Sequence, residues 1–250
     1  MIRIILLFLA CLAPIVVFAP AAHANGNLAF AQDIIATSDG DLKITFIGHG
    51  SLILTFKEKV IHVDPYSKLA DYNLLPKADA VLITHQHQDH LDLAALAAII
   101  DSDTDIVLNA KSAEILGRGR ILNNWQSTEL IGIPVEVVPA YNLVHKRDTG
   151  EAYHPKGEGN GYILTFGDKR IYIAGDTENY PEMTEINNID IAFLPMNLPY
   201  TMTPEMVKAA ALVIKPKTLY PYHFSDTDTN KLLELMKDNQ EIEIKIRNIQ

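Results

Sequence analysis

The sequence predicts an α/β fold in which sheets and helices pack as layers of a sandwich. Short runs of β-branched and apolar residues open each half of the chain, and helical patterns follow them in each half. A sheet has to bury its apolar face against another layer, so this repeated order favours helices packed over sheets. The chain of 250 residues is long enough for one large domain.

In the first half, residues 42–56 alternate as a strand does, with Gly48-His49-Gly50 interrupting them. Residues 60–63 form a second strand that ends at Asp64-Pro65. Residues 80–84 are continuously apolar, which is typical of a buried strand, and they lead directly into a histidine-rich segment. A helix over 91–100, a strand over 106–108 and a short helix over 112–116 are expected next.

The second half repeats this order. Pro204 favours a helix start and predicts a helix through Ile214, and Thr218–Tyr222 is a strand that leads to His223. Residues 143–161 are polar and contain glycine, so we expect a surface loop near the functional site. The remaining expected elements are strands over 135–138, 161–166, 170–174 and 189–194 and a helix over 229–238.

Composition narrows the class of partner. Hydrophobic residues make up 48% of the chain and charged residues 21%, which predicts an ordered globular core. The net charge is −10 and no basic run occurs, so nucleic acid is not expected as a partner. A small-molecule substrate is the better expectation, and the oligomeric state stays open.

The first residues resemble a signal peptide. Arg3 precedes an apolar stretch over residues 4–18, and Ala22-His23-Ala24 is a small-x-small cleavage site. The alternative, an uncleaved anchor, is less favoured because the stretch is short for a span of ~20 residues. We therefore expect a signal peptide over 1–24, one mature domain over 25–250, and an exported, periplasmic or secreted protein without a membrane span. Cleavage would also remove Cys11, the only cysteine, and with it any thiolate nucleophile or cysteine-ligated zinc.

The segment Thr84-His85-Gln86-His87-Gln88-Asp89-His90 is the strongest functional signal. Side chains two residues apart in an extended segment project to one side, so His85 and His87 can reach one ion together. Where the chain turns into the next helix, Asp89 and His90 can face a second ion. Imidazole and carboxylate ligands suit zinc, iron or manganese. The alternative is a polar capping loop that happens to be rich in histidine.

This segment resembles the signature of the metallo-β-lactamase-fold superfamily. Residues 44–51 and Val63-Asp64-Pro65 are similar to the start of that family, residues 171–177 to its metal-bridging aspartate motif, and residues 220–224 to its last metal histidine. Within the family, the chain is most similar to the branch of metal-dependent hydrolases that includes the ascorbate-6-phosphate lactonase. The resemblance implies a four-layer αββα sandwich of two similar halves, with the metals along one edge between the sheets.

The resemblance also implies a ligand set. His85 and His87 would hold the first ion, Asp89, His90 and His223 the second, and Asp176 would bridge them. The cofactor would be a pair of divalent ions, zinc by preference, with manganese or iron as alternatives. Asp176 and His223 each follow a predicted strand, where a rigid sheet can hold a ligand. Taken alone, Asp176 could be a turn aspartate and His223 a half-buried histidine without a function.

One position departs from the family pattern. The third histidine of the first ion is expected after a strand in the middle of the chain, where this sequence has Asn142. His154 is the preferred substitute because the following Pro155 favours a fixed, extended backbone. His145 is followed by Lys146 and Arg147 and is interpreted as a solvated loop residue. Without any of these, the protein would hold a single metal.

Six other residues have expected roles outside the ligand set. His62 lies within a predicted strand and is read as structural, whereas His49 could line the site or cap a strand end. Asp64 is expected to orient a metal histidine through its ring N–H. Asn197, Tyr200 and Tyr222 follow predicted strands and are possible contacts for the substrate, with core or turn roles as the alternative.

The predicted activity is hydrolysis of an ester, lactone, amide or phosphoester by a metal-activated water, with Asp89 or Asp176 accepting or relaying the proton. A lactone or phosphoester is preferred by analogy with the family branch. Three alternatives stay open. They are a mono-iron oxygenase or dioxygenase of the same fold, a non-catalytic metal-binding protein, and a β-lactamase.

Overall fold

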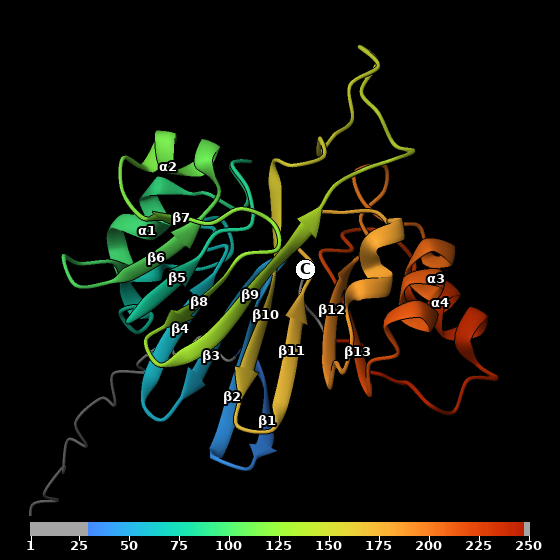
Figure 1. Ribbon diagram of the computed structural model, residues 1–250, viewed down its shortest axis with the longest axis horizontal. Helices are drawn as coiled ribbons and strands as arrows, with labels where there is room; N and C mark the ends of the chain where they lie inside the picture. Colours follow the sequence, from blue (N-terminus) through green and yellow to red (C-terminus); the bar gives the residue numbers. More distant parts are fainter. Residues whose placement is uncertain (1–29, 248–250) are drawn as a thin grey trace, which may run out of the picture.

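The computed structural model describes residues 30–247, and its core consists of two facing seven-stranded sheets (Figure 1). In each sheet the strands follow one another in chain order, with both parallel and antiparallel pairs. The first sheet comprises β1 (Ala31–Thr37), β2 (Gly40–Gly48), β3 (Ser51–Phe56), β4 (Lys59–Val63), β5 (Ala80–Leu82), β6 (Asp105–Leu108) and β7 (Arg120–Ile121). The second comprises β8 (Ser127–Leu130), β9 (Ile133–Ala140), β10 (Gly159–Phe166), β11 (Lys169–Ile173), β12 (Ile191–Pro195), β13 (Thr218–Tyr222) and β14 (Glu243–Ile244).

Helices cover the outer face of each sheet, so the predicted four-layer αββα sandwich is confirmed. Figure 1 places α1 (Leu93–Ile99) and α2 (Ala110–Leu116) on the side of the first sheet, and α3 (Pro204–Ile214) and α4 (Thr229–Met236) on the side of the second. Two short 3-10 helices, η1 (Tyr72–Leu74) and η2 (Pro181–Glu185), complete the helical segments.

The main core lies between the two sheets. Phe56 of β3 packs edge-on against Phe166 of β10, with ring centroids 5.2 Å apart, and Phe46 of β2 lies 6.1 Å from Phe193 of β12. All four rings are buried, and each contributes roughly 1.5–3 kcal/mol by leaving water. These contacts hold the sheets together and fix the edge at which the site forms.

Strand β5 explains why residues 80–84 show no polar alternation. Ala80 and Leu82 belong to the core between the sheets, whereas Val81 packs in a separate cluster under α1 with Leu96 and Ile99. A strand covered on both faces needs apolar residues throughout. The polar side chains begin at Thr84, immediately after this buried strand.

The observed elements differ from the expected ones mainly at their ends. Helix α1 begins at Leu93 instead of residue 91, because the carboxylate of Asp92 accepts hydrogen bonds from the backbone N–H groups of Ala94 and Ala95. Asp89 therefore lies before the helix, in a turn. Strands β1, β7, β8 and β14 were not expected, since they are short or carry polar residues, and pairing with a neighbouring strand defines them.

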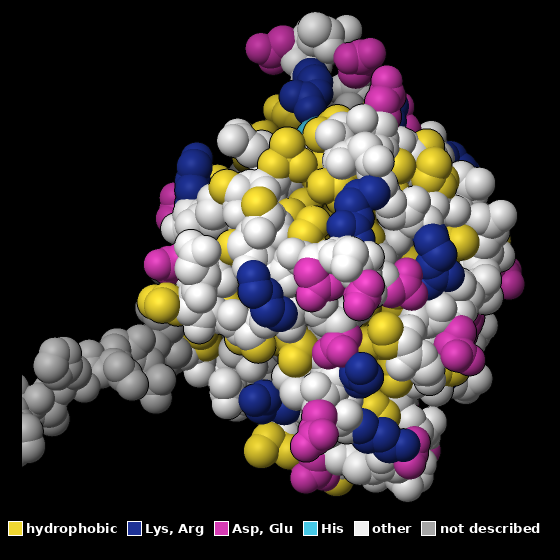
Figure 2. Space-filling view, turned by 90° about the vertical axis from the view of Figure 1, so that its left-hand side faces the viewer, with side chains coloured by type: hydrophobic (Ala, Val, Ile, Leu, Met, Phe, Trp, Pro, Cys, Tyr) yellow, Lys and Arg dark blue, Asp and Glu magenta, His cyan; other side chains and the backbone are white. Residues whose placement is uncertain are grey.

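The predicted signal peptide over 1–24 lies outside the described residues, so that prediction and the predicted export remain predictions. Within residues 30–247, no helix has the length and apolar character needed to cross a bilayer. On the face shown in Figure 2, lysine and arginine side chains are interspersed with acidic ones.

Candidate metal centre

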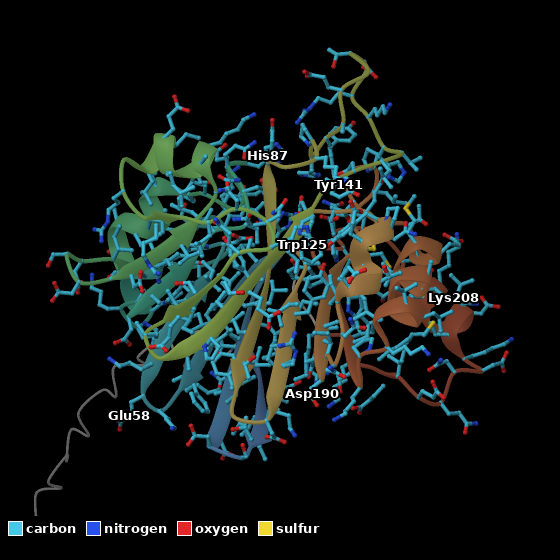
Figure 3. All side chains as sticks on the ribbon, viewed as in Figure 1. Glu58, His87, Trp125, Tyr141, Asp190 and Lys208 are labelled. Atoms are coloured by element: carbon cyan, nitrogen blue, oxygen red, sulfur yellow. The ribbon has the colours of Figure 1, made fainter. Side chains whose placement is uncertain are left out.

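Loops that follow strand ends gather at one edge of the sandwich. Figure 3 shows His87 at this edge, and Glu58 and Asp190 toward the opposite end of the molecule. His85, His87, Asp89 and His90 follow β5, Asp176 follows β11, and His223 follows β13. The carboxyl ends of β11, β12 and β13 lie together because these strands are parallel. The sequence-distant residues that were predicted to form one site therefore do lie together.

The candidate ligand atoms form two clusters, which a third, overlapping group of His85, His90 and Asp176 connects. In the first cluster, one ring nitrogen from each of His85, His87 and His154 lies within 4.8 Å of the others. In the second cluster, Asp89, His90 and His223 meet the same criterion together with His49. The backbone N–H groups of His90 and Leu91 both donate to the carbonyl of His87, and this turn brings Asp89 and His90 back toward the site.

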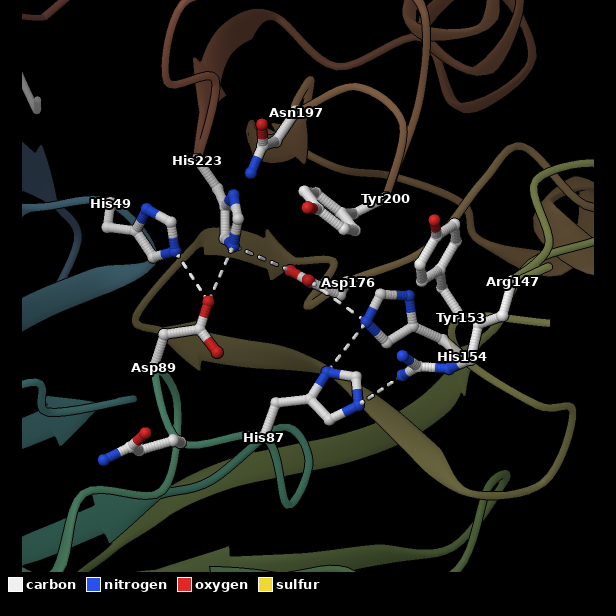
Figure 4. A pocket seen from close by; sticks show the side chains of 11 residues that line it. His49, His87, Asp89, Arg147, Tyr153, His154, Asp176, Asn197, Tyr200 and His223 are labelled. Carbon is white, nitrogen blue, oxygen red and sulfur yellow. Dashed lines mark hydrogen bonds and ion pairs between the residues drawn. The ribbon is translucent and has the colours of Figure 1, made fainter. Parts of the chain in front are cut away.

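Asp176 lies between the two clusters. Its Oδ2 is 3.2 Å from His154 Nε2, and its Oδ1 is 3.4 Å from His223 Nε2 (Figure 4). The same Oδ1 lies 3.4 Å from His90 Nε2. The side chain is buried. This is the position that a carboxylate shared by two ions would take.

A single buried carboxylate, Asp64, orients one histidine of each cluster. His90 Nδ1 lies 2.7 Å from Asp64 Oδ2, which leaves His90 Nε2 facing the site. Thr84 Oγ1 donates to the same carboxylate at 2.6 Å and lies 3.0 Å from His85 Nδ1, so it can accept that N–H. Fixing one ring nitrogen in this way turns the other toward a metal. The contact expected between Asp64 and a site histidine is therefore present.

His154, the preferred third histidine, reaches the first cluster. Its Nδ1 donates to Asn142 Oδ1 at 2.7 Å, and its Nε2 lies 3.2 Å from His87 Nδ1. Asn142 thus orients His154 and does not itself face the cluster. His145 turns away, with its Nδ1 2.6 Å from the buried carboxylate of Glu178. Of the three alternatives, the structure brings only the His154 ring nitrogen to the cluster.

The donor set suits a divalent cation. His85 Nε2 and Asp176 Oδ1 are buried and have no hydrogen-bond partner among the described residues. His90 Nε2 and His223 Nε2 face each other at 3.2 Å, as do the ring nitrogens of His87 and His154. Nitrogen and oxygen lone pairs that converge in a buried space are costly unless a donor or a cation satisfies them. Imidazole nitrogen with carboxylate oxygen is a common ligand combination for zinc, iron and manganese.

The protonation states agree with a metal site. Burial lowers the pKa of His87 and of His223 to about 4, and it lowers the pKa of His85 well below the usual range. These imidazoles are neutral at pH 7, as metal ligands must be. Burial also acts to lower the pKa of His90, but the carboxylates of Asp176 and Asp64 outweigh it and raise that pKa to about 10. His90 therefore carries a proton that a bound cation would release.

His49 lines the site, which is the first of the two roles that the sequence allowed for it. Its Nε2 lies 2.9 Å from Asp89 Oδ2, and its ring centroid is 3.6 Å from that of His223. The neighbouring Gly50 packs closely against His90. A Cβ at this position would lie 3.0 Å from the His90 ring, which favours glycine here. By contrast, His62 is buried away from the site, donates to the Pro76 carbonyl, and has its pKa lowered to about 4 by burial.

A pocket of about 470 Å³ opens over the two clusters. Asn197 and Tyr200 line it, as expected, but Tyr222 does not. Tyr222 is fully buried, and its hydroxyl accepts a hydrogen bond from the Gly175 N–H, so the alternative core role is correct for this residue.

Sequence reasoning missed several residues of the pocket. Gln88, Arg147 and Tyr153 line it, and the last two come from the long loop between β9 and β10 that was expected to lie near function. Glu178, which is fully buried, accepts hydrogen bonds from the backbone N–H groups of Leu143, Val144 and His145 and so anchors this loop. Only the length and polarity of the loop signalled its importance, because the contacts with Glu178 are tertiary.

Comparison with known proteins identifies the family. The beta-lactamase superfamily domain matches residues 43–223 of the chain. The chain belongs to this superfamily. A UPF0173 metal-dependent hydrolase of Nanoarchaeum equitans is 31% identical over 190 residues, which cover 74% of this chain and 84% of the relative. The predicted family is therefore confirmed, and the protein is an enzyme of the metal-dependent hydrolase class.

Solved structures agree with this assignment. A candidate metal-dependent hydrolase from Parabacteroides distasonis is 49% identical, with a TM-score of 0.84 over 89% of this chain and 100% of that one. Igni18, a metallo hydrolase of the archaeon Ignicoccus hospitalis, is 24% identical and has a TM-score of 0.69 over 83% and 95% of the two chains. The similarity to Igni18 supports the fold and not the activity. A specific relation to the ascorbate-6-phosphate lactonase stays a prediction.

Proposed function

We propose that the protein hydrolyses an ester, lactone or phosphoester bond with two divalent ions, zinc by preference. His85, His87 and His154 would hold one ion, and Asp89, His90 and His223 the other. The observation that carries the proposal is the position of Asp176, whose two carboxylate oxygens face one cluster each. A pair of ions held in this way lowers the pKa of a bound water toward neutrality and polarises the oxygen of the attacked bond.

The side chains around the clusters supply the remaining functions. Asp89 borders the pocket, and hydrogen bonding to His49 together with the nearby His90 lowers its pKa although burial opposes this. The carboxylate is therefore ionised at neutral pH and can accept a proton from the attacking water. Asp176 is the second candidate for this role. The amide of Asn197 and the ring of Tyr200 line the pocket, where they can contact and position the substrate (Figure 4).

Metal analysis combined with a hydrolysis screen tests the proposal. The wild type, His87→Ala and the control Lys146→Ala would be compared by mass spectrometry for metal content and assayed on ester, lactone and phosphoester substrates. We expect His87→Ala to lose metal and, since an ion contributes several kcal/mol to transition-state stabilisation, on the order of 1,000-fold in activity. Lys146→Ala should keep both, because Lys146 is exposed and does not line the pocket.

The same experiment separates the alternatives. Full activity in His87→Ala would contradict the proposal. One iron per chain with oxygen uptake would identify an oxygenase, and stoichiometric metal without turnover would identify a binding protein. Turnover of nitrocefin that a chelator abolishes would identify a β-lactamase.

A further inference from the structure

The loop between β9 and β10 places Arg147 at the mouth of the pocket. In Figure 4 the Arg147 side chain reaches toward His87, beside His154 and Tyr153 of the same loop. Among the residues that line the pocket, Arg147 is the one that carries a permanent positive charge. The chain as a whole has a net charge of −10, so this local cation, beside the proposed metal ions, is a feature of the protein itself that can attract an anion into the pocket.

The guanidinium is held by an aromatic ring and has a single long contact from one of its donors, to His87, among the described residues. It lies over the ring of Tyr153, 5.1 Å from the centroid, in a cation–π contact. Within residues 30–247, Arg147 forms no ion pair with an aspartate or glutamate. Glu178 fixes the base of the loop through the backbone N–H groups of Leu143 and Val144. The N–H groups of Arg147 are therefore available to a ligand.

Within residues 30–247, the guanidinium has one polar contact, with His87, and this contact cannot be a hydrogen bond once His87 serves as a metal ligand. Arg147 Nη2 lies 3.5 Å from His87 Nε2, whereas His87 Nδ1 faces His154 in the first cluster. If the Nδ1 lone pair is directed at an ion, the ring proton is on Nε2, which is then a donor. A guanidinium has only donors, so no hydrogen bond can form between these groups. A bound anion would provide an acceptor that neither group has within residues 30–247.

We propose that Arg147 binds a carboxylate or phosphate group of the substrate, which makes the substrate of this hydrolase an anion. Arginine suits this role because its planar fork can donate two parallel hydrogen bonds to either group. Tyr153 and Tyr200, whose rings meet edge to face with centroids 5.0 Å apart, form a wall of the pocket against which the rest of the molecule packs. The inference rests on the proposed hydrolysis at the two clusters.

Two carboxylate esters of similar size that differ in charge, together with one phosphate ester, test the proposal. Mono-p-nitrophenyl succinate carries a carboxylate, p-nitrophenyl butyrate is neutral, and p-nitrophenyl phosphate provides the phosphate group. We expect Arg147→Gln to raise the KM for at least one of the two anionic substrates by about tenfold, the order of effect of losing one charge-assisted hydrogen bond. The KM for the butyrate ester should change less than about twofold in this variant. If the variant raises the KM for the succinate ester more, Arg147 binds a carboxylate. If it raises the KM for p-nitrophenyl phosphate more, Arg147 binds a phosphate.

Two variants serve as controls. Lys146→Gln removes the neighbouring charge, which is exposed and does not line the pocket, and it should leave both esters unaffected. Arg147→Lys should restore part of the affinity, because an ammonium keeps the charge but lacks the fork. Equal metal content in all variants, measured by mass spectrometry, would show that the first cluster is intact.

Binding provides a readout that does not depend on turnover. Calorimetric titration of the zinc-loaded protein with phenylphosphonate and with benzoate should show about tenfold weaker binding in Arg147→Gln than in Lys146→Gln. If the wild type cleaves none of the substrates but binds these probes through Arg147, the proposed hydrolysis fails and the anion site stands. If Arg147→Gln matches the wild type in binding and in KM, the anion site is wrong and the hydrolase proposal is unaffected.

Discussion

The two clusters of the candidate metal centre are assembled in different ways. The second cluster depends on rigid neighbours, because His90 is held by the buried Asp64, and the backbone of His223, at the end of β13, donates to the carbonyl of His49. The first cluster is completed by His154, which comes from a long loop held by Asn142 and Glu178. That loop also carries Arg147 and Tyr153. One cluster is thus part of the scaffold, whereas the other shares a loop with the substrate pocket.

Asp176 is common to both clusters, so its removal should have the largest effect. Asp176→Ala deletes the carboxylate that faces His154 on one side and His90 and His223 on the other. We expect loss of metal from both clusters and a fall in hydrolytic activity on the order of 1,000-fold or more. Metal content and kcat/KM would be measured together. Loss of only one ion would show that Asp176 belongs to a single cluster.

Asp64 should come next, because it orients a histidine of each cluster. Asp64→Asn keeps the shape but can place an amide donor against the Thr84 hydroxyl or the His90 ring N–H, both of which need an acceptor. We expect a 10–100-fold loss of metal affinity, as for other residues that orient ligands. Competition with a chelator measures the affinity.

Asp92→Asn is the matched control for this variant. Asp92 caps α1 and accepts hydrogen bonds from Ser67, so its replacement should affect stability and leave metal affinity unchanged. Equal metal affinities in Asp64→Asn and the wild type would show that Asp64 is not needed to orient the histidines of the two clusters.

Asn142→Ala is expected to have a smaller effect that is confined to the first cluster. It removes the acceptor for the His154 Nδ1–H and also a hydrogen bond to the Tyr200 carbonyl. We expect one of two ions to bind about tenfold more weakly while the other is unaffected. Titration with a coloured divalent ion such as cobalt would resolve the two binding steps. Equal weakening of both steps would contradict the difference between the clusters.

Much of the fold was predictable from local patterns. The continuous apolar run before Thr84 predicted β5, and Pro204 predicted the start of α3, because burial and backbone restriction act on these segments directly. Strand β1 was not predicted. Its polar residues hide the strand pattern, and its full-length pairing with β2 is a tertiary effect.

The residues of the candidate site were predictable where the candidate ligands are close in sequence or directly follow a strand. His85 to His90 and the positions of Asp176 and His223 are of this kind. His154 was preferred because of Pro155, whereas the structure shows that Asn142 orients it. Arg147 and Glu178 could not be found, since their roles depend on how a loop folds back over the sheet edge. The metal identity, the bond cleaved and the predicted export remain predictions.

Anomalous diffraction from crystals of the zinc-loaded protein would test the central claim most directly. The account predicts two peaks, one bounded by His85, His87 and His154 and one by Asp89, His90 and His223, with Asp176 contacting both. A single peak, or peaks at any other place in the protein, would contradict it.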